Sequence, residues 1–158
     1  MKRFARSISP LKLGAVALLL VFTGQAATQD PELKPTYGQV KLKAGFTPDP
    51  YTKQVEAGGP IETNLGGVKA WVAKAPDFKL FYTAGNFPLT IHVECNEDTT
   101  LLINLPDGKW IANDDGRNNG LNPLLRFEKP QSGRYDIWVG TFRKGGTPPA
   151  KLLITELK

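Results

Sequence analysis

From residue 40 onward, apolar and polar positions alternate in short segments that are separated by Gly, Pro and Asn. Residues 89–95 are typical: Leu89, Ile91, Val93 and Cys95 fall on one side, which is the two-residue period of a half-buried strand. Further segments of this kind lie at 40–46, 55–60, 68–73, 77–82, 100–105, 109–111, 124–127, 134–142 and 151–157. Because short strands recur roughly every ten residues and no segment has a helical period, the pattern predicts an all-β fold. We expect an antiparallel, jelly-roll-like β-sandwich of about eight to nine strands.

The segment 134–142 also predicts which side chains face the core. Tyr135, Ile137 and Val139 share one face of the expected strand. Trp138 is out of phase with them, so it faces either solvent or a second layer. If Trp138 and Trp110 are exposed, they are candidate stacking platforms for a sugar ligand.

The first 27 residues have the pattern of an export signal. Four basic residues precede the apolar run Leu13–Phe22, and small residues follow it, which predicts cleavage after Ala26 or Ala27. An uncleaved anchor is the alternative, although the run is shorter than the roughly 20 residues of a membrane span. We therefore expect a signal peptide at 1–27, a flexible leader at 28–39 and one β-sandwich domain at 40–158. The mature protein is expected in the periplasm or outside the cell, with no stable membrane span.

Removal of the signal changes the charge of the chain. Four of the 20 Lys and Arg residues, and none of the 15 Asp and Glu residues, lie in the first 27 positions. The mature chain is therefore nearly neutral, and no basic stripe remains to support a nucleic-acid partner. Cys95 and His92 are the only residues of their kinds, which excludes an intramolecular disulfide and the usual zinc sites.

One loop concentrates oxygen-bearing side chains. Asn113, Asp114 and Asp115 precede a glycine, Asn122 follows, and Asp98 begins a neighbouring strand. Carboxylate and amide oxygens on a tight turn suit calcium, so these five residues are the candidate metal ligands. An ordinary polar turn is the alternative, because Asn, Asp and Gly are also the usual turn residues.

Other candidate chemistry is sparse. His92 is expected on the surface of its strand, and Cys95 is expected to be a buried, inert thiol. Ser132, the one serine outside the signal, lies in an expected turn and has no marked catalytic partner. Asp107 and Asp136 are explained as well by turn and surface roles as by a glycosidase pair.

Several motifs occur in a familiar order: Asp98-Thr-Thr-Leu-Leu-Ile, a Pro106-Asp-Gly turn, Asn113-Asp-Asp, Leu121-Asn-Pro, and Pro130-x-x-Gly-x-Tyr135-x-Ile-Trp-Val-Gly140. Together they resemble the bacterial pre-peptidase C-terminal domain, in its stand-alone exported type. The resemblance implies a jelly-roll-like sandwich that is usually non-catalytic, and calcium binding in some members. It matches Asp98 to the acidic start of the motif strand, Asn113–Asp115 to the polar loop and Asn122 to the next polar position.

These observations favour an exported, non-enzymatic binding or accessory module with an unidentified protein or glycan ligand and a calcium-stabilised loop. Two alternatives stay open. One is a carbohydrate-binding module that uses Trp110 or Trp138, and the other is a small hydrolase with an unrecognised site.

Overall fold

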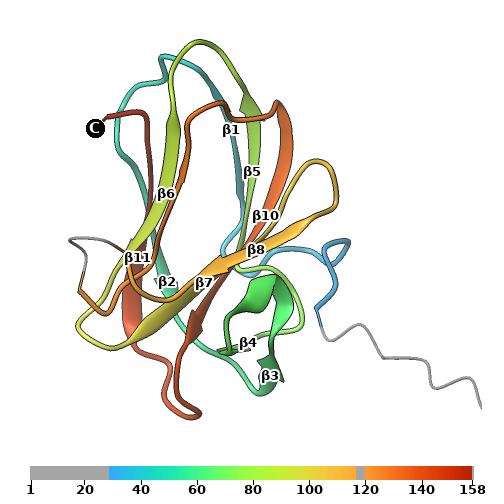
Figure 1. Ribbon diagram of the computed structural model, residues 1–158, viewed down its shortest axis with the longest axis vertical. Coiled ribbons are helices and arrows are strands. Elements are labelled where there is room, and N and C mark those ends of the chain that lie inside the picture. Colours follow the sequence, from blue (N-terminus) through green and yellow to red (C-terminus); the bar gives the residue numbers. More distant parts are fainter. Residues whose placement is uncertain (1–28, 117–119, 158) are drawn as a thin grey trace, which may run out of the picture.

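The computed structural model describes residues 29–116 and 120–157, which form a sandwich of two β-sheets (Figure 1). The predicted all-β sandwich is confirmed. The described residues contain eleven strands and one 3-10 turn: β1 (Gln39–Lys43), β2 (Tyr51–Glu56), β3 (Ile61–Thr63), η1 (Leu65–Gly67), β4 (Ala70–Val72), β5 (Phe78–Thr83), β6 (Leu89–Glu94), β7 (Thr99–Asn104), β8 (Trp110–Asn113), β9 (Leu124–Phe127), β10 (Gly133–Thr141) and β11 (Pro149–Thr155). Sheet A contains β1, β3, β4, β5, β7, β8 and β10, and sheet B has the order β2-β11-β6-β9.

The main core fills the space between the two sheets. Alternate residues of each strand supply it, as a period of two requires. Tyr135, Ile137 and Val139 of β10 belong to this core, together with Leu89, Ile91 and Val93 of β6. The strand phase that the sequence predicts for both segments is therefore correct.

Strand β10 organises sheet A because it pairs with three other strands. Along one edge, residues 136–141 pair with β7. Along the other edge, residues 133–137 pair with β5, and Thr141 pairs with Trp71 of β4. Between those two partners, a stretch of β10 has no strand beside it.

Two loop residues fill that stretch. The backbone N–H of Val139 donates to Oδ2 of Asp77 at 2.7 Å, and its carbonyl accepts from the N–H of Gly58 at 2.8 Å. The N–H of Asp77 also donates to the carbonyl of Ile137 at 2.8 Å. Asp77 thus continues the hydrogen-bond ladder with its own backbone and carboxylate, which satisfies buried backbone groups.

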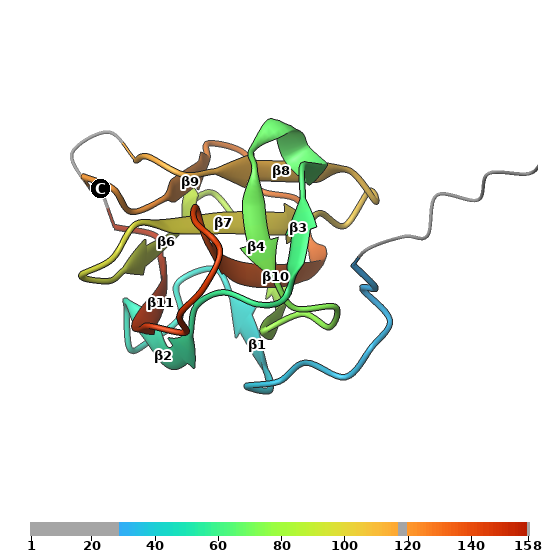
Figure 2. The same cartoon turned by 90° about the horizontal axis from the view of Figure 1, so that it is seen from below.

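A smaller second core lies on the outer face of sheet A. Ala70 and Val72 of β4 pack there against Leu102 and Trp138, with Trp110 half-buried beside them. Figure 2 shows β3 and β4 crossing β7 and β8 on this face. The close approach needs a glycine on β10, because a Cβ at Gly140 would lie 2.4 Å from Oγ1 of Thr100 and 2.7 Å from a methyl of Val72.

Three sequence expectations need correction. The described residues form eleven strands rather than eight or nine, since short strands such as β3 give little periodic signal. The sheets are not wholly antiparallel, because β1 runs parallel to β5. The expected leader 28–39 is not a loose tail: Asp30 and Thr36 donate to the carbonyls of Lys74 and Pro76, and β1 begins at Gln39.

The predicted signal at 1–27 lies outside the described residues. Within the part of the chain that the structure does describe, we find no helix with the length and apolar character needed to cross a membrane.

The core position of Ile137 can be tested by truncation. Ile137 is 0% exposed, so Ile137→Ala should lower the free energy of unfolding by about 2–5 kcal/mol. Urea unfolding of the variant and the parent measures this loss. A loss below about 0.5 kcal/mol would contradict the packing, since surface substitutions have effects of that size.

The bridging role of Asp77 predicts a pH effect on stability. Burial raises the pKa of Asp77 to about 7 from its usual 3.8, so its contribution to stability is complete in acid and is lost as the pH rises through about 7. Asp77→Asn keeps an oxygen for Val139 and cannot ionise. We expect the stability of this variant relative to the parent to increase between pH 5 and pH 8.

The matched control for that experiment is Asp77→Ala. It leaves the Val139 N–H without its acceptor and, like Asp77→Asn, cannot ionise, so it should be about 1–3 kcal/mol less stable than Asp77→Asn at both pH values. Urea unfolding at the two pH values measures both variants. A stability difference between Asp77→Asn and the parent that does not change with pH would contradict a titrating Asp77.

Candidate functional site

The predicted acidic loop lies at one end of sheet A. Leu101 of β7 pairs with Asn113 of β8, and continuing this register places Asp98 across from Gly116. The chain then folds back, because the N–H of Gly116 donates to the carbonyl of Asn122 at 2.8 Å. The structure therefore brings Asp98, Asp114 and Asp115 to the same end of the sheet. Asn118 and Asn119, which add further amide oxygens in the sequence, lie outside the described residues.

The two predicted asparagine ligands have structural contacts. Oδ1 of Asn113 accepts from the N–H of Leu124 at 2.9 Å. Oδ1 of Asn122 accepts from Oγ1 of Thr99 at 2.6 Å, and its Nδ2 donates to the carbonyl of Cys95 at 2.7 Å. Both side chains therefore tie the loop to neighbouring strands.

The carboxylates at this end repel one another. Burial raises the pKa of Asp98, and the charges of Asp115 and Asp114 raise it further, while Arg143 acts in the opposite direction. Among residues 29–116 and 120–157, no group of three or more His, Cys, Asp or Glu side chains is arranged to hold a metal ion. The described side chains thus give a crowded acidic surface without an assembled ligand set.

The tryptophans predicted as ligand platforms pack on each other. Their ring centroids lie 5.1 Å apart, and Trp138 is 0% exposed. Trp138 therefore faces the second layer, which corrects its prediction as an exposed platform. Trp110 is half-buried and packs against it.

The residues considered for hydrolysis lie apart. Ser132 precedes β10 of sheet A, and its Oγ accepts from the N–H of Ala84 at 2.9 Å. His92 is half-buried on sheet B, and burial lowers its pKa. Cys95 is half-buried rather than fully buried, and its Sγ lies 3.5 Å from the carbonyl of Pro149. None of these contacts joins a nucleophile to a base.

A groove that the sequence does not predict lies at the opposite end of sheet A. It is open, has a volume of about 1020 Å³, and is lined by β1, β5, β7, β10 and the leader residue Glu32. We call it the outer groove. Lys41, Lys43, Phe81, Thr83 and Arg134 contribute to its walls and floor.

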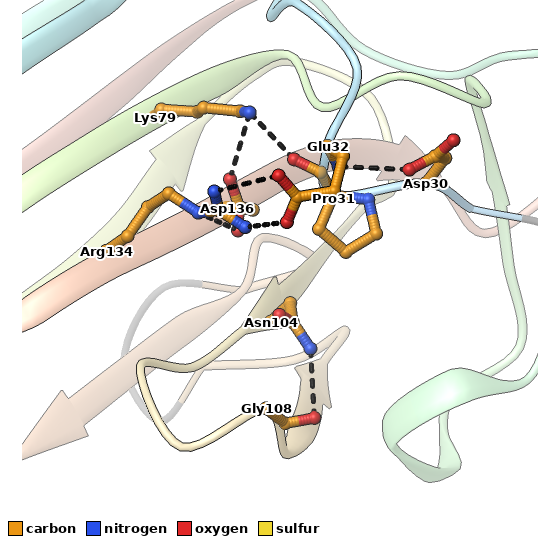
Figure 3. Close-up of polar contacts among 8 residues, drawn as sticks. All are labelled: Asp30, Pro31, Glu32, Lys79, Asn104, Gly108, Arg134 and Asp136. Atoms are coloured by element: carbon orange, nitrogen blue, oxygen red, sulfur yellow. Dashed lines mark hydrogen bonds and ion pairs between the residues drawn. The ribbon is translucent and has the colours of Figure 1, made fainter.

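A network of charges forms one wall of the outer groove (Figure 3). Nε of Arg134 lies 2.9 Å from Oδ2 of Asp136, and its Nη2 lies 2.6 Å from Oε1 of Glu32. Nζ of Lys79 lies 3.5 Å from Oδ1 of Asp136 and donates to the carbonyl of Pro31 at 2.7 Å. Burial raises the pKa of Asp136, although Arg134 and Lys79 oppose this shift. The arginine holds the pKa of Glu32 below its usual value.

Although the sequence does not predict the groove, it does indicate that two residues of its wall share a face. The alternation in β10 places Arg134 and Asp136 on the face opposite Tyr135 and Ile137. Glu32 gave no such signal, because it reaches Arg134 across 102 positions of the chain.

The comparisons with known proteins assign no family to this chain. No protein-family model and no curated protein sequence matches this chain, and the resemblance to pre-peptidase C-terminal domains stays a prediction. Among solved structures, the chain is similar to PliG of Aeromonas hydrophila, a periplasmic lysozyme inhibitor of g-type lysozyme. The TM-score is 0.37 and the identity 17%, over 75% of this chain and 96% of that chain. A similarity at this level assigns neither fold nor function.

The crowded carboxylates make the predicted calcium effect testable by thermal unfolding. The raised pKa of Asp98 means that its stabilising effect is lost as the pH rises through that pKa, so the ionised loop is less stable at pH 7. A cation that binds there reverses this loss. Calcium at about 100 times its dissociation constant should add about 2.7 kcal/mol, and Asp115→Asn should reduce this gain.

Magnesium and the remote variant Glu56→Gln, on β2 of sheet B, are the controls. Without added metal, Asp115→Asn should be more stable than the parent at pH 7, because it removes a charge that repels Asp98. A midpoint that does not respond to millimolar calcium would identify the loop as an ordinary polar turn.

Proposed function

We propose that this chain is an exported, non-catalytic β-sandwich module that binds a protein partner through the outer groove. The observation that carries the proposal is the groove itself. It is open along sheet A, and charged side chains of both signs line it. Pockets for small molecules are mostly apolar and bury nearly all of their ligand, whereas an open charged groove suits a protruding or extended segment of another protein.

Rigid elements surround this surface. Arg134 and Asp136 lie on β10, which is paired along both edges at Asp136. Lys79 of the adjacent β5 is fixed by its bonds to Asp136 and Pro31. Binding to a preformed surface costs less ordering entropy than binding to a mobile loop.

The export part of the proposal comes from the first 27 residues and from where the fold begins. The N–H of Asp30 donates to the carbonyl of Lys74 at 2.9 Å, so contacts with the rest of the fold start just after the predicted cleavage at Ala26 or Ala27. Cleavage there would leave these contacts intact. The resemblance to pre-peptidase C-terminal domains favours the same class of exported, non-catalytic accessory module.

The two other hypotheses have less support. A sugar-stacking site needs an exposed ring, whereas Trp138 is buried and Trp110 is half-buried and packs against it. A serine hydrolase needs a base beside Ser132, whose described hydrogen bond is to the backbone of Ala84. We keep calcium as a property of the opposite end of sheet A, separate from the binding surface.

Site-specific crosslinking tests the proposed function. A photoreactive amino acid at Thr83, which is exposed in the groove, should capture a distinct protein from the exported fraction of the source organism. Thr52 is the matched control, because it is also an exposed threonine on a strand but belongs to sheet B. In the crosslinked product, the N-terminus of this protein should be residue 27 or 28, as the predicted signal cleavage requires.

Two outcomes would overturn the proposal. One is the capture of the same proteins from both positions, which would indicate nonspecific contact. The other is turnover of ester, peptide or glycoside substrates by the purified protein at a rate that follows its concentration.

A further inference from the structure

A side chain of the protein itself, the carboxylate of Glu32, occupies part of the outer groove. Both carboxylate oxygens of Glu32 face the guanidinium of Arg134, with Oε1 at 2.6 Å from Nη2 and Oε2 at 3.3 Å from Nη1. This two-point contact is the geometry by which arginine recognises carboxylates. The Glu32 side chain is nevertheless 77% exposed, and exposed ion pairs contribute little to stability. Another carboxylate can therefore replace it at small cost.

Two further cations extend this carboxylate site along the groove. Lys41 and Lys43 are exposed on β1 and line the groove. Neither belongs to any of the ion pairs found among the residues that the structure describes. They lie two positions apart on one strand, so their side chains share a face and are roughly 7 Å apart.

The backbone of β1 is also available. In sheet A this strand ends the order, and among the described residues it pairs with β5 alone. Lys79 donates to the carbonyl of Gly38, and Ala44 donates to the carbonyl of Thr83. Because residues of a parallel strand alternate in the direction of their backbone groups, the groups of Lys41 and Lys43 point to the free edge.

We propose that the outer groove and the free edge of β1 bind an extended acidic segment of a protein partner. Its backbone pairs with β1, its alternate carboxylates reach Lys43 and Lys41, and its chain continues across the groove so that a further carboxylate takes the place of Glu32 at Arg134. This proposal rests on the proposed function and names the class of partner. Strand addition at a sheet edge supplies affinity through the backbone, and the alternate side chains supply specificity. A partner segment of about five residues matches the length of β1.

A labelled peptide with alternating Thr and Glu tests this proposal, with binding measured by fluorescence anisotropy. Lys41→Ala combined with Lys43→Ala should weaken binding about tenfold, since two charge pairs are lost. The matched control is Lys129→Ala combined with Lys151→Ala, which removes the same charge from exposed positions that do not line the groove. Glu32→Gln should strengthen binding, by up to about fivefold, because it removes the internal competitor.

A second peptide tests the backbone contact. The same Thr-Glu peptide with alternate N-methylated amides keeps its charge but loses the donors on one edge, and the two methylation registers remove the donors of opposite edges. We expect the peptide methylated on the edge that faces β1 to bind at least tenfold more weakly than the parent peptide, and the peptide methylated on the other edge to bind like the parent. Binding of both methylated peptides equal to that of the parent peptide would overturn strand addition.

Three other results would also overturn the inference. One is polygalacturonate binding with the same response to the lysine variants, which would show that the groove recognises negative charge without a peptide backbone. Another is weaker peptide binding by Glu32→Gln. The third is no binding of the Thr-Glu peptide together with self-association of the double lysine variant, which would show that Lys41 and Lys43 protect an edge strand. If crosslinking at Thr83 still captures a protein, the proposed function survives any of these results.

Discussion

The hydrogen bond between the Asp77 carboxylate and the N–H of Val139 holds together the parts of sheet A. Strand β10 has β5 beside it up to Ile137 and β4 beside it at Thr141. Asp77 occupies the interval, and its carbonyl also accepts from the N–H of Tyr37 at 2.8 Å. One residue therefore connects β10, the start of β5 and the leader, and the outer groove depends on all three being in place.

The two faces of β10 have different roles in the fold. Tyr135, Ile137 and Val139 face sheet B and fill the main core. On the opposite face, Trp138 is covered by β4 and by Trp110, whereas Arg134 and Asp136 remain beside the leader. Apolar burial at one end of the strand and a charge network at the other are both consequences of the same two-residue period.

Sequence reasoning succeeded where the signal is local. Alternation over a few residues predicts the inward position of Ile137, and the recurrence of such segments predicts the sandwich. It failed where contacts join distant positions. The leader looked polar and loose because its partners, Lys74, Pro76 and Arg134, are supplied by other parts of the chain. The parallel pairing of β1 with β5 likewise depends on the path of the chain between them, and no local pattern encodes it.

The difference between local and long-range contacts also explains why the sequence indicated the acidic loop and not the outer groove. The acidic loop is conspicuous in sequence because its residues are adjacent, yet Asn113 and Asn122 hold backbone and side-chain partners that fix the loop. The outer groove draws Glu32, Lys41, Phe81 and Arg134 from four separate segments, so its chemistry becomes visible only after folding. Its carboxylate site is already filled by Glu32, an exposed residue held by a weak pair. A surface that binds its own side chain weakly in this way retains the geometry for a partner with the same chemistry.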